Sequence, residues 1–207
     1  YLKYHYPRQY MAALLTSVLD SSSKVSEYIG LCKEMGIEVL PPDINESYAG
    51  FTVSGEHIRF GLAAIKNVGR GLIEQLVRER ESGGKFTDFE QFCRRMSTEI
   101  NKRALEGLIK CGAFAFTGAN RAQLIKVYSQ VLDAVSNESR KNLDGQFNLF
   151  TGEAAKISRL AFPDVPEFSK RELLAMEKEN TGLYLSGHPM DSLAPLAEQA
   201  GAVPISR

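Results

Sequence analysis

Residues 62–73 read Leu-Ala-Ala-Ile-Lys-Asn-Val-Gly-Arg-Gly-Leu-Ile, and this stretch decides the fold. Apolar residues lead into a turn rich in small residues, and the apolar positions from Leu72 to Val77 then recur at helical spacing. The pattern predicts two short helices joined by a tight turn. Val68 is expected to be the apolar plug that packs this turn into the core.

The turn has the residue types that binding of a phosphate group requires. Gly69 and Gly71 adopt positive φ freely and Asn67 does so tolerably, so backbone N–H groups at the start of the second helix can point outward. The pattern resembles a helix-hairpin-helix motif, in which Asn67 occupies a place usually given to glycine. It predicts sequence-independent contact with the DNA backbone through Lys66, Asn67, Val68, Gly69, Arg70 and Gly71. The alternative is a glycine turn that only packs.

A second, more degenerate unit of the same kind spans residues 101–113. Asn101 suits the N-cap of a helix that closes at Gly112, and Lys110 stands at the first glycine position of this hairpin. The candidate DNA contacts here are Lys102, Arg103, Lys110 and Gly112. The alternative is that this unit packs against the first, since neither could bury a core alone.

Outward from these units, the pattern predicts a mainly α fold. Residues 1–60 are expected to form a small helical subdomain with a short β element, followed by a tandem helix-hairpin-helix domain at 61–136. An exposed peptide at 137–151 and a linker with one helix at 152–207 complete the prediction. A capping box, Ser169 to Glu172, is expected to open that helix.

Several side chains elsewhere are predicted to have structural roles. Phe86, Phe89 and Phe92 recur at helical spacing, which indicates a core face rather than a platform for stacking bases. Cys111 is expected to be a small core residue and not a reactive thiol. The carboxylates of Glu177 and Glu179 are expected on a solvated helix face.

Composition bounds the class of protein. Hydrophobic residues make up 43% and charged residues 24%, which is ordinary for a globular domain. No apolar run is long enough to span a membrane, so no membrane partner is expected. The 3 cysteines are scattered and odd in number, which argues against a disulfide framework or a zinc site and favours a reducing cytoplasm. The opening residues lack a starting methionine and look like the inside of a helix, which indicates an excised piece of a longer protein.

The net charge of zero conceals an asymmetry along the chain. Residues 57–126 carry 13 lysines and arginines against 7 acidic residues, a net of +6, whereas each flanking part has a net of −3. A basic middle between acidic ends is typical of a local site for a polyanion. The alternative is a solvated mixture of charges.

Stretches along nearly the whole chain resemble, in order, a bacterial family of C-family replicative DNA polymerases, the polymerase III alpha subunits. The matching stretches are Tyr1 to Thr16, Met35 to Asn45, Arg59 to Gly69, Asn101 to Arg103, Gly112 to Phe114, Asn120 to Ala122 and Leu183 to Pro189. The resemblance implies a segment that runs from the late fingers region through a tandem helix-hairpin-helix domain to just before an OB-fold. It also implies that the catalytic aspartates and the Mg²⁺ of the polymerase lie outside this segment, which is expected to hold no cofactor or metal and no catalytic residue.

The same resemblance gives a meaning to Gln146, Phe147, Asn148, Leu149 and Phe150. They are similar to the short peptide by which bacterial proteins bind the sliding clamp, with Leu149 and Phe150 as anchors and Gln146 at the rim. A polar stretch that exposes apolar side chains is costly unless a partner buries them. The alternative is that these side chains pack against the chain's own core.

The predicted function is therefore non-catalytic: to hold duplex DNA by its backbone and to dock a polymerase on the sliding clamp (beta subunit), with other replisome subunits reached through the parent. One rival is an interaction scaffold that binds the clamp alone and whose hairpins only pack. The other is a nuclease or lyase, which would need clustered carboxylates or an activated nucleophile. No such cluster stands out in the sequence.

Overall fold

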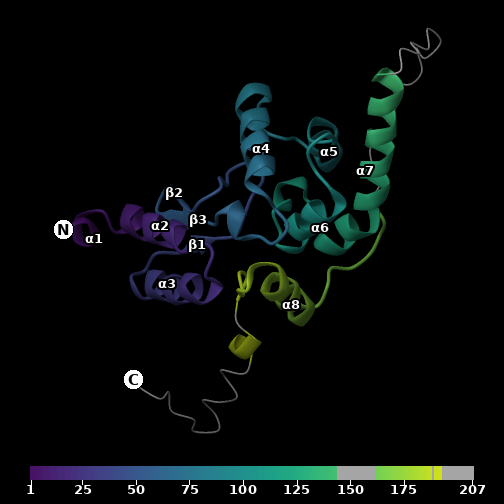
Figure 1. The fold of residues 1–207 in the computed structure, drawn as a ribbon. Coiled ribbons are helices and arrows are strands. Elements are labelled where there is room, and N and C mark those ends of the chain that lie inside the picture. Colours follow the sequence, from purple (N-terminus) through teal and green to yellow (C-terminus); the bar gives the residue numbers. More distant parts are fainter. Residues whose placement is uncertain (144–161, 188, 193–207) are drawn as a thin grey trace.

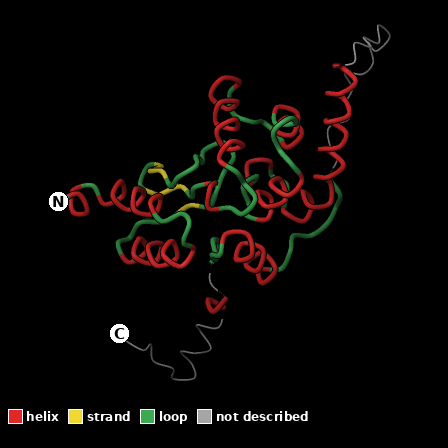
Figure 2. The backbone as a smooth tube through the Cα atoms, in the orientation of Figure 1, coloured by secondary structure: helices red, strands yellow, loops and turns green. Residues whose placement is uncertain are grey.

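A computed structural model describes residues 1–143, 162–187 and 189–192, and over these residues the chain is mainly helical, as predicted (Figures 1 and 2). Short helices separated by turns account for most of it. The α-helices are α1 (Leu2–His5), α2 (Pro7–Ser17), α3 (Ser22–Glu34), α4 (Arg70–Gly83), α5 (Phe89–Arg95), α6 (Lys102–Lys110), α7 (Arg121–Leu143) and α8 (Lys170–Thr181). The 3-10 helices are η1 (Leu62–Ala64), η2 (Ala115–Thr117) and η3 (Pro189–Ser192).

A small sheet accompanies the first helices and has the strand order β1-β3-β2. Strands β2 (Thr52–Ser54) and β3 (His57–Arg59) form the predicted short β element, an antiparallel hairpin in which Gly55 takes a positive φ of 57°. Strand β1 (Val39–Leu40) pairs with β3 in parallel. Ile58, at the centre of the sheet, is completely buried because its side chain faces the helices.

The helices begin where the sequence places capping side chains. The Asn101 side chain accepts a hydrogen bond from the Ala104 N–H at 2.9 Å and opens α6. Ser169 and Glu172 form the predicted capping box of α8, each side chain accepting from the backbone N–H of the other. Such caps satisfy N–H groups that have no partner inside the helix. Both predicted caps are thus confirmed.

The three phenylalanines of the predicted core face are buried, with exposed fractions of 0 to 2%. The Phe92 ring lies edge-on to the rings of Phe86 and Phe114, with centroids 5.1 and 4.9 Å apart. The Phe89 ring meets Phe114 in the same way at 5.1 Å. Edge-to-face pairs of this kind add to the stabilisation that burial alone provides. The prediction of a core role is confirmed.

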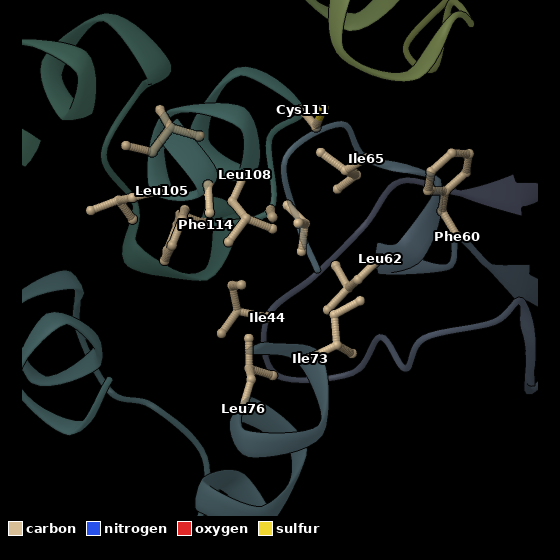
Figure 3. Packing of buried hydrophobic residues seen from close by; sticks show 14 of the residues in the cluster. Ile44, Phe60, Leu62, Ile65, Ile73, Leu76, Leu105, Leu108, Cys111 and Phe114 are labelled. Atoms are coloured by element: carbon tan, nitrogen blue, oxygen red, sulfur yellow. The ribbon is translucent and has the colours of Figure 1, made fainter. Parts of the chain in front are cut away.

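One hydrophobic cluster runs without a break across residue 60. It extends from Met11 in α2 to Leu183 after α8. Ile44 lies at its centre: its N–H donates to the Ala113 carbonyl at 3.0 Å and its carbonyl accepts from the Arg80 side chain at 2.9 Å. Figure 3 shows Ile44 among side chains from α4 and α6. The part of the chain before residue 60 therefore belongs to the same core as both hairpins.

The three thiols are buried in this core. Burial raises the pKa of Cys32 to about 11 and those of Cys93 and Cys111 to about 12. A thiol that does not ionise at neutral pH is a poor nucleophile. The structure therefore agrees with the structural role predicted for Cys111.

We expect the native chain to show almost no reaction with a thiol reagent such as DTNB at pH 8, because the thiolate fraction is negligible and the sulfur atoms are enclosed. The same chain in guanidinium chloride should titrate all 3 cysteines. A thiol that reacts rapidly in the folded chain would contradict this burial.

Candidate nucleic-acid interface

The first hairpin consists of η1, a turn at residues 65–69 and α4. Its positive φ lies at Asn67, with a value of 64°, and not at the glycines. Gly69 has a φ of −75° as the N-cap of α4, and Gly71 lies inside the first turn of that helix. Of the three residues that the sequence offers for positive φ, Asn67 adopts it, whereas Gly69 and Gly71 do not need their conformational freedom here. Asparagine tolerates the left-handed region better than most residues, which explains how it replaces glycine here.

Val68 fixes this turn to the core. Its side chain is only 7% exposed, although both neighbours in the sequence are exposed. Its N–H donates to the Ile65 carbonyl at 3.3 Å, which closes the turn. The predicted role of Val68 as an apolar plug is confirmed, and it leaves the following residues at the surface.

The N–H groups that follow the plug are free. Within the described residues, the N–H groups of Gly69, Arg70, Gly71 and Leu72 donate no intramolecular hydrogen bond. Gly69 and Gly71 are exposed, and no atom lies within 4 Å of the position where either would carry a Cβ. The start of α4, a helix of 14 residues, therefore presents unpaired donors and the positive end of its dipole to solvent.

Positive side chains flank these donors. Lys66 and Arg70 are both exposed, and neither side chain forms an ion pair or hydrogen bond within the described chain. A phosphate group at the start of α4 would meet several N–H donors and two free cations. The arrangement is the one that backbone recognition of nucleic acid requires.

Many other basic side chains between residues 57 and 126 are engaged internally. Arg80 is 7% exposed and donates to the carbonyls of Ile44 and Ser47, both at 2.9 Å. Arg95 stacks on the Phe86 ring with its Cζ atom 4.3 Å from the centroid. The sequence count of +6 therefore overstates the charge available to a ligand. The side chains of this segment that make no ion pair or hydrogen bond in the part described are Lys66, Arg70, Lys85, Arg103 and Lys126.

The second hairpin uses its turn donors internally. Gly112 has the expected positive φ, 79°, but its N–H donates to the Ile109 carbonyl at 2.9 Å, and the Ala113 N–H donates to the Leu108 carbonyl at 3.0 Å. These bonds close the C-terminus of α6. Gly112 therefore offers no free N–H group to a phosphate in this arrangement.

The cations of the second hairpin differ in their environment. Lys110 Nζ lies 2.8 Å from Glu106 Oε1, and this bond lowers the pKa of Glu106 and raises that of Lys110. Lys102 Nζ lies 2.7 Å from Asp133 Oδ2, in a pair that is about half exposed. Exposed pairs of this kind are weak and can be exchanged for a phosphate. Arg103 is exposed and unpaired, so it is the predicted contact of this hairpin with the freest charge.

The two hairpins pack against each other, as the sequence alternative proposed for the second. A Cβ at Gly107 in α6 would lie 3.2 Å from the Lys66 carbonyl oxygen of the first turn, so glycine permits the close approach. The Lys66 N–H in turn donates to the Asn180 carbonyl of α8 at 2.8 Å. Helix α8 therefore holds the first turn through the backbone of Lys66.

Glu177 corrects the sequence analysis, which placed it on a solvated face. Its side chain is fully buried, and Oε1 lies 2.9 Å from Nη2 of Arg121. The other oxygen accepts from the N–H groups of Leu185 and Ser186 at 2.8 and 2.9 Å. Arg121 also donates to the Lys110 carbonyl at 2.8 Å. The pair therefore joins the end of α6, the start of α7 and the turn after α8, whereas Glu179 is exposed as predicted.

A signal in the sequence could have identified Glu177. Leu174, Glu177 and Thr181 follow the spacing i, i+3, i+7, which places them on one face of a helix. Leu174 and Thr181 are both buried on that face. A carboxylate between two such residues needs a basic partner.

Two further expectations concern residues and sites beyond these hairpins. Residues Gln146 to Phe150, the predicted clamp peptide, lie outside the described residues. Within the described ranges, no group of three or more histidine, cysteine or acidic side chains is placed to hold a metal ion. No helix of that same part is long and apolar enough to cross a bilayer.

Comparison with known proteins agrees with this geometry. Residues 36–124 match a family model described as a helix-hairpin-helix motif. DNA polymerase III subunit alpha of Mycobacterium tuberculosis is 42% identical over 203 residues, which are 95% of this chain and 17% of that protein. The corresponding subunits of Deinococcus radiodurans and Neisseria meningitidis are 41% and 40% identical over 97% and 100% of the chain.

The chain spans less than a fifth of the length of these relatives, 17%, 15% and 18% in the three cases. In each case the match covers 95% or more of this chain. The chain is therefore homologous, over nearly its whole length, to one segment of the bacterial DNA polymerase III alpha subunits.

Proposed function

We propose that this chain holds duplex DNA through the phosphate backbone, without reading its sequence. The observation that carries the proposal is the open start of α4, where the N–H groups of Gly69, Arg70 and Gly71 have no partner within the described chain. Lys66 and Arg70 supply the charge beside them. Contacts of this kind position a protein on DNA but carry no base information.

We propose that the DNA-holding segment is part of a longer polymerase, which we call the parent protein. A DNA polymerase III alpha subunit is a nucleotidyltransferase, and we propose that this segment belongs to such an enzyme in the cytoplasm and is itself non-catalytic. The Mg²⁺ expected for that chemistry would be held by carboxylates elsewhere in the parent. The segment would run from the late fingers region towards an OB-fold and hold the duplex that leaves the active site.

We further propose that Gln146 to Phe150 dock the polymerase on the sliding clamp. Burial of a leucine and a phenylalanine contributes about 3–6 kcal/mol before the costs of association, which leaves a weak contact. Two weak contacts on one duplex, one to DNA and one to a ring around it, multiply avidity by about 10²–10⁴. Processive synthesis would follow from this linkage. A rival, that the hairpins only pack and the clamp is the sole partner, is favoured for the second hairpin by its internally bonded turn.

The salt dependence of duplex binding tests the DNA-holding role. If Lys66, Arg70 and Arg103 each neutralise one phosphate, log K should fall with log salt with a slope of about −3. Between 50 and 200 mM salt, the affinity should then fall by about 40-fold. Fluorescence anisotropy with two labelled duplexes of unrelated sequence measures both the slope and the lack of specificity. Binding that is insensitive to salt, or confined to one duplex, would contradict the proposal.

Removal of the clamp anchors tests the second role. The substitutions Leu149→Ala and Phe150→Ala together should abolish capture of purified clamp by the immobilised chain, because the apolar side chains that enter the partner are gone. Leu2→Ala, which truncates an exposed leucine of α1 outside residues 137–151, is the control and should leave capture unchanged. Clamp retained at wild-type level by the double variant would remove the peptide assignment.

A further inference from the structure

Helix α7 is the next α-helix after α6 and follows it through the turn at Gly112 and η2, as α4 follows η1 in the first hairpin, so we count the start of α7 with the second hairpin. In the first hairpin the N–H groups of Arg70 and Gly71, the first two residues of the helix, are free. In the second hairpin the N–H groups of Arg121 and Ala122 hold the same positions. Here both N–H groups are occupied by one carboxylate from the same chain.

That carboxylate belongs to Glu167. Its Oε2 accepts from the Arg121 N–H at 2.9 Å and its Oε1 accepts from the Ala122 N–H at 3.1 Å. Oε1 also accepts from the Phe168 N–H at 2.9 Å, which orients the carboxylate. A carboxylate that bridges the first two N–H groups of a helix makes the contacts that a phosphate would make there.

The segment that carries Glu167 is held to α7 at further points. We call residues 162–168 the strap. The Asn120 side chain donates to the Val165 carbonyl, and the Gln123 side chain to the Pro163 carbonyl, each at 3.0 Å. Phe162, at the beginning of the strap, packs against the hydrophobic core. The strap is thus aligned with the start of α7, and Glu167 is its charged contact with the helix.

We propose that Glu167 acts as an internal substitute for a DNA phosphate and closes the second hairpin to the duplex. This inference rests on the proposed DNA-holding function of the first hairpin. The two hairpins then have different tasks: the first is open to the backbone of DNA, and the second anchors the chain's own C-terminal strap. Strap and phosphate compete for the start of α7, so release of the strap adds a phosphate contact to the DNA-holding surface.

The test compares Glu167→Ala with Asp164→Ala in the full 207-residue chain. Both changes remove one negative charge from the strap, but Asp164 is exposed and accepts no hydrogen bond among the described residues. Relative to Asp164→Ala, we expect Glu167→Ala to bind duplex several-fold more tightly at low salt and to steepen the salt slope by about 1. Glu167→Gln, which keeps the side-chain length and one acceptor oxygen, should lie between them. Equal slopes and affinities for all three variants would overturn the competition.

A second readout does not involve DNA. In titrations with inorganic phosphate followed by NMR, the amide signals of Arg121 and Ala122 should move in Glu167→Ala and stay unchanged in Asp164→Ala. Absence of movement in Glu167→Ala would refute the inference even if the duplex is bound. Conversely, movement of these signals in a chain that binds no duplex would leave the competition for α7 standing and reject the function proposed for the first hairpin.

Discussion

Reversal of two charges, Lys66→Glu with Arg70→Glu, is expected to reduce the affinity for duplex DNA by well over tenfold at low salt. Both side chains lie beside the unpaired N–H groups at the start of α4, and neither has an intramolecular partner in the described chain. The change removes two attractive contacts and introduces two repulsive ones at the position of a phosphate. Each lost phosphate contact should also reduce the salt slope by about 0.9, so the slope should fall from about −3 to about −1.

A matched variant separates local contact from overall charge. Lys24→Glu with Lys33→Glu makes the same change in net charge on α3, where both lysines are exposed and unpaired among the described residues. Its salt slope should stay close to that of the wild type. Because the four substituted side chains are exposed and form no ion pair or hydrogen bond within the described chain, the thermal midpoints of both variants should match that of the wild type. If the two double variants lose affinity equally, the start of α4 is not the DNA contact, and the packing-only alternative for the hairpins stands.

Val68 contributes to the candidate DNA site by its position in the turn and not by a direct contact of its side chain. Val68 holds the turn but is 7% exposed, so it is not placed to touch a ligand by its side chain. Its predicted membership of the DNA-binding set therefore rests on its backbone and on the turn that it fixes. The N–H of Val68 is itself used, since it donates to the Ile65 carbonyl. The contact with phosphate falls to the residues that follow.

Local patterns predicted much of this architecture. The capping residues Asn101 and Ser169, the phenylalanine face and the β-hairpin are encoded within a few residues of sequence, where spacing and residue type determine the outcome. The first hairpin was also found from a twelve-residue stretch, residues 62–73. The sequence left open which residue of the turn takes positive φ, because asparagine and glycine both permit it and only the path of the chain selects between them.

Contacts between residues far apart in the chain could not be predicted from the sequence. Arg121 is 56 positions from Glu177 and 46 from Glu167, and it engages both, one through its side chain and the other through its N–H. No periodicity relates residues at such separations. A count of charges also cannot distinguish Arg80, which is enclosed, from Arg70, which is exposed. Which cations remain for a ligand is decided by tertiary packing.

The two hairpins have similar sequence patterns but differ in whether their N–H donors are available to a ligand. Within the described chain the first hairpin keeps its helix-start donors and its cations without partners, and α8 holds its turn through the Lys66 N–H. In the second hairpin, the N–H groups of the turn donate to carbonyls at the end of α6, and the first two N–H groups of α7 donate to the Glu167 carboxylate. The first hairpin therefore offers an open site for a phosphate, whereas the second hairpin packs against it and supports it.

Loss of the buried carboxylate in Glu177→Ala is expected to lower the free energy of unfolding by about 3–5 kcal/mol. Arg121 would keep its charge in a site where its guanidinium is mostly enclosed, and the N–H groups of Leu185 and Ser186 would lose their acceptor. For a chain of this length each kcal/mol corresponds to about 2–4 °C, so the thermal midpoint should fall by about 10 °C. Circular dichroism at 222 nm measures it directly.

Glu179→Ala is the matched control, because it removes the same group from an exposed position of the same helix. Its midpoint should stay close to that of the wild type, as is usual for surface substitutions. Arg121→Ala should destabilise to a similar degree as Glu177→Ala, and the double variant should lose much less than the sum of the two, since the residues interact directly. Strict additivity would mean that each side chain stabilises the fold through other contacts. In that case the buried pair would not be what joins α6, α7 and the turn after α8.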